Sequence, residues 1–150
     1  MLLRFLVIQP ADSCLGVPVA WMLSSNGTQP MIKYFIKLVK DQSPDVSPSI
    51  FMTNQDQAQV NAIRETYPSS HILYCWWHVL RAIRTPFVVT EFKELWQLIQ
   101  RWVQTTDQYE FESWWEDIQN DDSVPKSVAQ YLAQEWMPVK DMWSAVYWQN

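Results

Sequence analysis

Two short segments of this 150-residue chain carry residue types suited to catalysis or metal binding. The first is Asn54-Gln-Asp56, which directly follows the short apolar run 49–53. In an α/β nuclease or hydrolase, carboxylates at strand ends hold divalent cations, because hard ions prefer carboxylate oxygens. The residue at this strand exit is Asn54, whose amide oxygen is neutral. The position therefore predicts a severe loss of metal affinity.

Both residues of this segment also suit structural roles. Asn54 is a favoured helix N-cap, with Gln57 three residues later in the position of a capping box. Asp56 falls in the first turn of the predicted helix, where its negative charge complements the helix dipole. A catalytic role for Asp56 would require it to reach back past the strand end. We expect the cap and dipole roles, and Asp56 is the alternative catalytic carboxylate.

The second segment is Cys75-Trp-Trp-His78, which places a thiol and an imidazole three residues apart at a predicted strand-to-helix junction. A closed zinc site needs four ligands, and the remaining Cys14 and His71 form no second spaced pair. A nucleophilic Cys–His pair would need an orienting group and an oxyanion site, which the sequence does not show. We therefore expect a structural junction, and a metal site at Cys75 and His78 is the alternative.

Composition and charge narrow the classes of function. The chain is 48% hydrophobic with ten Trp, which indicates a folded protein, and its two Gly exclude a phosphate-binding glycine loop. Residues 1–84 carry seven Lys and Arg against five Asp and Glu, whereas residues 85–150 carry four against eleven. An acidic surface repels phosphate, so the second half is a poor DNA-binding face and the first half is only weakly basic.

Cysteine content and hydropathy indicate the cellular compartment and the relation to membranes. The two Cys lack the spacing of a disulfide scaffold, which suits a reducing compartment. No apolar run approaches the ~20 residues that a membrane span needs, so we expect a soluble intracellular chain with no membrane partner. The opening run Leu2–Ile8 is predicted to be a buried strand and not a secretory leader, because Arg4 interrupts it and no cleavage motif follows.

The first half of the chain reads as strands alternating with helices, in the order ββαβαβα. The predicted strands are 2–8, 17–23, 49–53 and 71–75, and the predicted helices begin at Thr28, Asn54 and Trp76. This order predicts an α/β domain with crossover helices on a mixed sheet. The first of these helices has an apolar face formed by Ile32, Phe35, Ile36 and Val39. We expect its opposite face to be solvated, and that face carries Lys33, Lys37 and Lys40.

After Pro86 the pattern changes to helices alone, with apolar residues recurring at helical spacing. Thr105 with Gln108 resembles a capping box, and Pro125 suits a first helical turn. Nine of the ten Trp lie at or beyond Trp76, and their periodicity predicts packing between helices and not a base-stacking platform. We divide the chain into a core at residues 1–84 and a helical region at 85–150.

Three segments together resemble one family. Residues 16–23 (GVPVAWML), 51–63 (FMTNQDQAQVNAI) and 67–82 (YPSSHILYCWWHVLRA) are similar, in order and spacing, to segments of Mutator-like (MULE) transposases. The resemblance implies a partial ribonuclease H-like fold at residues 1–84 and a helical insertion of the same domain at 85–150. Cys75 and His78 match the family's C-x-x-H motif.

The resemblance also implies a chemistry that this chain does not match. Such transposases cut and join DNA ends with Mg²⁺ or Mn²⁺ held by Asp, Asp and Glu, and the second Asp falls on Asn54. The first would lie before Leu2 and the Glu beyond Asn150, so no catalytic residue is intact and this chain has no expected cofactor.

We expect a nuclear, DNA-transposition-related protein that is a catalytically inactive, truncated remnant. One alternative is a retained protein-interaction module that binds a partner or itself through an exposed apolar edge. Another is an active transposase that uses Asp56 and is completed by missing sequence.

Overall fold

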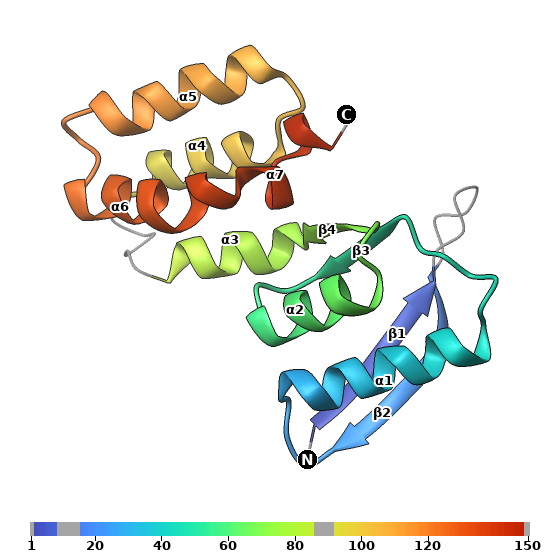
Figure 1. The fold of residues 1–150 in the computed structure, drawn as a ribbon. Coiled ribbons are helices and arrows are strands. Elements are labelled where there is room, and N and C mark those ends of the chain that lie inside the picture. The colour runs from blue at the N-terminus through green and yellow to red at the C-terminus, as the bar shows by residue number, and fades with distance from the viewer. Residues whose placement is uncertain (1, 9–15, 86–91, 149–150) are drawn as a thin grey trace. The chain divides into compact units, whose positions relative to one another are not determined.

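The computed structural model describes residues 2–8, 16–85 and 92–148, and it confirms a mixed α/β architecture with the predicted order ββαβαβα. The chain divides into two compact units (Figure 1). The first comprises Met1–Phe51 with Asp56–His71, and the second comprises Met52–Gln55 with Ile72–Asn150.

The first unit opens with a hairpin of β1 (Leu2–Ile8) and β2 (Val17–Ser24). The strands are antiparallel, from Leu2 opposite Ser24 to Ile8 opposite Val17, with a shift of register between Leu6 and Val7. The expected burial of β1 on both faces, and Cys14, lie outside the described side chains.

Much of the exposed surface of β2 is apolar. Four apolar residues of the strand are exposed, and Trp21 is 73% exposed; the four are Val17, Val19, Trp21 and Leu23. In the same strand Ser24 is buried and Ala20 and Met22 are half-buried. The hairpin therefore carries an unpartnered apolar stripe, named here the β2 stripe.

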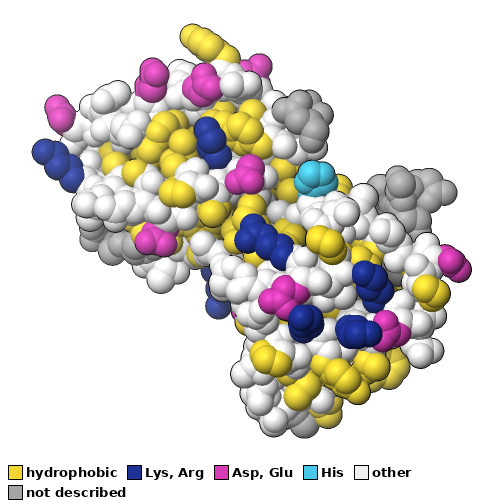
Figure 2. Space-filling view, in the orientation of Figure 1, with side chains coloured by type: hydrophobic (Ala, Val, Ile, Leu, Met, Phe, Trp, Pro, Cys, Tyr) yellow, Lys and Arg dark blue, Asp and Glu magenta, His cyan; other side chains and the backbone are white. Residues whose placement is uncertain are grey.

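Two helices of the first unit, α1 (Gln29–Gln42) and α2 (Gln57–Thr66), pack against each other. Ile32 and Ile36 are buried, which confirms the predicted apolar face of α1. Lys33 and Lys37 are exposed, and their Nζ atoms lie 2.6 Å from carboxylate oxygens of Glu65 and Asp41. Basic and acidic side chains accordingly lie next to one another on this surface (Figure 2).

The second pair of strands, β3 (Ile50–Thr53) and β4 (His71–Tyr74), forms a separate two-stranded sheet. The His71 N–H donates to Ser49 O at 2.9 Å, and the Cys75 N–H donates to Thr53 O at 2.9 Å. In both bonds the donor and acceptor residues are separated by the same number of positions along the chain. The two strands therefore run parallel, and α2 is the crossover between them. Among the described residues the hydrogen-bond ladders join β1 to β2 and β3 to β4, a pairing that apolar periodicity does not specify.

The second unit continues with helices, as predicted. They are α3 (Trp76–Arg84), α4 (Lys93–Gln104), α5 (Gln108–Asn120), α6 (Lys126–Tyr131), a π-helical turn at Leu132–Trp136, a 3₁₀ turn at Met137–Val139, α7 (Lys140–Trp143) and a 3₁₀ turn at Ala145–Tyr147. The π turn closes through a bond from the Met137 N–H to Leu132 O, and Pro138 ends it.

Aromatic rings form the core of the second unit. Trp102, Trp136, Trp143 and Phe111 are fully buried, and the Trp143 ring lies 5.0 Å from that of Trp102 and 5.8 Å from that of Phe111. The Trp143 indole N–H donates to Trp136 O at 2.8 Å. For these three tryptophans the core-packing prediction is confirmed.

The helix starts of this unit differ from the predicted ones at α5 and at α6. The N-cap of α5 is Asp107, whose Oδ1 accepts from the Glu110 N–H at 2.9 Å, and not Thr105. The Thr105 hydroxyl instead donates to Glu110 Oε2 at 2.8 Å. The helix begins two residues later than the Thr105–Gln108 pattern implied. Pro125 directly precedes α6, at its N-cap.

Candidate functional site

The exit of β3 is the position at which a nuclease of this architecture would place a carboxylate. Thr53 is buried there, and its hydroxyl donates to Asn54 Oδ1 at 3.5 Å. Asn54 itself is half-buried, so its side chain is held at the strand end and not directed fully to solvent. The atom presented at this point is a neutral amide oxygen.

Asp56 is the N-cap of α2, which corrects the prediction that Asn54 caps this helix. Asp56 Oδ1 accepts from the Ala58 N–H at 2.9 Å, and its Oδ2 accepts from Gln59 Nε2 at 3.2 Å. The backbone of Asp56 is extended, as a cap residue requires, and the first helical residue is Gln57. The prediction failed because Asn and Asp are equally good caps and the strand-to-helix turn contains both.

No group of three or more His, Cys, Asp and Glu side chains in the described part of the chain is placed to hold a metal ion. Asp56 caps the start of α2. The residues present at the β3 exit therefore do not fit a site for two divalent cations, which would need several converging carboxylates.

Cys75 and His78 lie at the start of α3. Cys75 is the N-cap residue, its thiol is reduced and half-buried, and its backbone joins β3 through Thr53 O and the first turn of α3 through Val79 N. His78 is exposed, and its ring lies 4.9 Å from that of Trp77 in an edge-on arrangement. His71 is exposed at the start of β4. The backbone contacts of Cys75 are those of a strand-to-helix junction.

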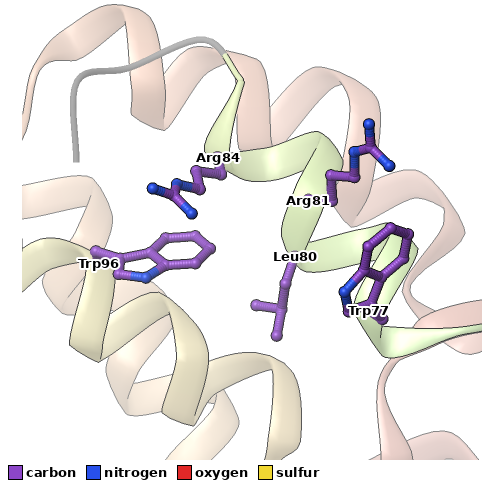
Figure 3. Close-up of a pocket in the computed structure, with 5 residues that line it drawn as sticks. All are labelled: Trp77, Leu80, Arg81, Arg84 and Trp96. Carbon is purple, nitrogen blue, oxygen red and sulfur yellow. The ribbon is translucent and has the colours of Figure 1, made fainter.

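The second unit contains one arrangement that the sequence reasoning missed. A hollow of about 340 Å³ is lined by four residues of α3 and one of α4 (Figure 3): Trp77, Leu80, Arg81, Arg84 and Trp96. The Arg81 guanidinium lies 5.1 Å from the centre of the Trp77 ring. Trp77, Arg81 and Arg84 stand at i, i+4 and i+7, so helical spacing alone could have placed them on one face.

Comparison with known proteins decides the family. A model of the MULE transposase domain matches residues 2–82, just over half of the chain and nearly all of β1 to α3. The chain belongs to the MULE transposase family. The resemblance drawn from the three segments is thereby confirmed, and the function of this MULE domain is transposase-related. No curated protein matches the chain. Among the described helices of this MULE domain, none has the length and hydropathy to span a bilayer.

Proposed function

We propose that this chain is a MULE transposase domain of ribonuclease H-like fold that does not cut DNA. The observation that carries the proposal is Asn54 at the end of β3, where the resemblance places the family's second Asp. The parallel β3–α2–β4 unit that precedes α3 supports the fold assignment, since a crossover helix between parallel strands is what a ribonuclease H-like core requires. A transposase-derived protein of this kind acts, or its ancestor acted, on DNA in the nucleus.

The chemical reason concerns charge. When Mg²⁺ or Mn²⁺ is bound, a transposase site uses two cations to activate the attacking oxygen and to stabilise the leaving one. Each cation needs anionic oxygen ligands, and the Asn54 amide supplies a neutral one. Asp56 offers the only carboxylate within residues 54–56, and its two oxygens accept hydrogen bonds from Ala58 and Gln59.

The test combines metal binding with DNA cleavage. Thermal unfolding with and without Mn²⁺, and nicking of supercoiled plasmid, would be measured for the unmodified chain, Asn54→Asp and Asp56→Asn. A ligand at 100 times its Kd stabilises a fold by about 2.7 kcal/mol, which thermal unfolding detects readily. We expect no Mn²⁺-dependent stabilisation and no nicking by the unmodified chain. Asn54→Asp should not nick either, because the family's first Asp and its Glu match no residue of this chain.

One result would overturn the proposal. Nicking by the unmodified chain that requires Mn²⁺ and is lost in Asp56→Asn would show that Asp56 serves as a metal ligand in place of the missing Asp. The alternative of an active transposase would then be correct.

The β2 stripe favours a second candidate function, a protein-interaction module. Its exposed apolar residues are of the kind that marks protein contacts, and a second copy of the chain offers the same residues. Sedimentation at increasing concentration distinguishes the two functions. A module of this kind would form dimers that Trp21→Ser weakens, whereas a chain without interaction function would remain monomeric in both forms.

A further inference from the structure

We propose that the hollow on α3 binds single-stranded nucleic acid, with a base stacked on Trp77 and the flanking phosphates held by Arg81 and Arg84. The proposal goes beyond the function proposed above and does not depend on whether the chain cuts DNA, because stacking and guanidinium–phosphate contacts need no metal. It stands on three features of the second unit: an exposed indole, two arginines that have no salt bridge among the described residues, and a hollow that these residues line.

The first feature is the exposure of Trp77. Its side chain is 60% exposed, while Trp102, Trp136 and Trp143 of the same unit are buried. Leaving a large apolar ring in water costs free energy that burial would recover. Aromatic rings presented in this way are the platforms on which single-stranded nucleic acids stack their bases.

The second feature is the pair of arginines. Among the described residues neither Arg81 nor Arg84 has a carboxylate within salt-bridge distance, whereas Lys33 and Lys37 of the first unit are both paired. The α3 sequence, WWHVLRAIR, contains no Asp or Glu. A planar guanidinium matches phosphate oxygens through paired N–H donors and also stacks on aromatic rings. Within the described part of the chain, no carboxylate competes with an outside anion for these two cations.

The third feature is the shape of the hollow. In Figure 3 the Arg84 side chain lies beside the Trp96 ring, and the Arg81 side chain lies beside the Trp77 ring. A volume of about 340 Å³ is at the lower end of the roughly 300–1,000 Å³ range of small-molecule sites. This suits one base with its phosphate and not the wide contact surface of a duplex.

The negative charge of the remaining helices favours a single strand over a duplex as the ligand. Residues 85–150 carry eleven acids against four bases, so a long rigid polyanion is repelled beyond the hollow. A flexible single strand can contact the hollow and direct its other phosphates away. Trp and Arg are also frequent at the centres of protein interfaces, but two guanidinium groups that line one hollow without a carboxylate partner among the described residues favour a phosphate-bearing partner over an apolar one.

The experiment measures fluorescence anisotropy of labelled oligothymidine of about ten nucleotides, titrated with the full chain in EDTA. Single-strand affinity falls with salt with a slope of about −0.7 per phosphate contact, so two arginines predict a slope of about −1.4. Arg81→Gln should reduce the slope to about −0.7. Trp77→Ala should weaken binding about tenfold without changing the slope, because stacking releases no counterions.

Matched controls are available on the same unit. Lys126→Gln removes an exposed positive charge and Tyr109→Ala removes a ring that is 81% exposed, and neither residue lines the hollow. Both should bind oligothymidine as the unmodified chain does. Circular dichroism would confirm that every variant keeps its helices.

Three results would overturn the proposal. The first is no binding by the unmodified chain at low salt. The second is an equal loss in the hollow variants and the controls, which would show non-specific attraction. The third is competition by an acidic peptide that equals competition by unlabelled oligothymidine, which would make the hollow a protein-docking site. Because EDTA is present throughout, none of these results bears on cleavage, and a cleavage result does not bear on them.

Discussion

Replacing Asp56 separates its structural role from a catalytic one. As the N-cap of α2, its carboxylate accepts from the Ala58 N–H at 2.9 Å. Loss of an N-cap side chain typically costs about 1 kcal/mol, with a range of about 0.5–2, and Asn caps as well as Asp. Asp56→Ala should therefore lower the free energy of unfolding by about 1 kcal/mol, while Asp56→Asn should lower it by no more than a few tenths.

Two measurements check this expectation. Urea denaturation followed by circular dichroism gives the free energy of unfolding, and a change of about 1 kcal/mol corresponds to roughly 2–4 °C in Tm for a chain of this size. Amide hydrogen exchange provides a local reading, because the Ala58 N–H should exchange faster in Asp56→Ala and remain protected in Asp56→Asn.

The reasoning would be refuted in either of two ways. If Asp56→Ala is as stable as the unmodified chain and Ala58 stays protected, the cap contributes nothing. If Mn²⁺ stabilises the unmodified chain and both substitutions abolish that effect equally, the carboxylate charge matters more than the capping oxygen. Asn caps a helix as well as Asp but is a much weaker metal ligand. Asp56→Asn therefore distinguishes a capping role from a metal-binding role.

Two further predictions concern the cores of the units. Trp143→Ala removes a fully buried ring and should lower the free energy of unfolding by about 3–5 kcal/mol, measured by urea denaturation. Burial, and to a lesser degree the nearby Asp41 charge, raise the pKa of Tyr67 in the folded chain. Because the pKa of Tyr67 is higher in the folded than in the unfolded chain, the protonated phenol contributes to stability. This contribution is fully present below about pH 10 and is lost as the pH rises through the pKa of the folded chain. Tyr67→Phe should therefore flatten the fall of Tm measured at alkaline pH.

Each of these predictions has a contrary outcome. A loss below about 1 kcal/mol in Trp143→Ala would show that the surrounding rings close over the space, contrary to the rigid packing inferred here. If Tyr67→Phe and the unmodified chain lose stability in parallel above pH 10, other groups control the alkaline transition.

The order of strands and helices was predictable because local patterns encode it. Apolar runs of strand length, broken by Pro, Ser and Gly, placed all four strands, and helical spacing placed Ile32 and Ile36 in the core. Which strands hydrogen-bond to one another depends on contacts far apart along the chain, so the two separate sheets were not predictable from these patterns.

The candidate site was predictable in its residues but not in their roles. The neutral side chain at the β3 exit is plain from Asn54 in the sequence. The assignment of the cap was wrong because the turn holds two residues of nearly equal capping strength, Asn54 and Asp56, and only the backbone fixes where α2 begins.

The hollow on α3 was missed for a different reason. Helical periodicity does not distinguish among the nine tryptophans at or beyond Trp76, of which three are buried, five are half-buried and Trp77 is exposed. Trp77 differs only in facing outward with Arg81, a distinction that depends on how α3 is rotated about its own axis.

The π-helical turn at Leu132–Trp136 bears on how evolution or engineering can alter the length of this chain. The turn holds one residue more than an α-helical turn of the same height, so a deletion inside it would be absorbed as ordinary α-helix. Later residues would keep their rotational position about the axis, because removing the extra residue turns the i→i+5 hydrogen bond into the ordinary i→i+4 bond. Met142 and Trp143 would stay in the interior. The loss of a single codon is therefore more tolerable in this turn than in a regular α-helix, where it would rotate every later residue by about 100°.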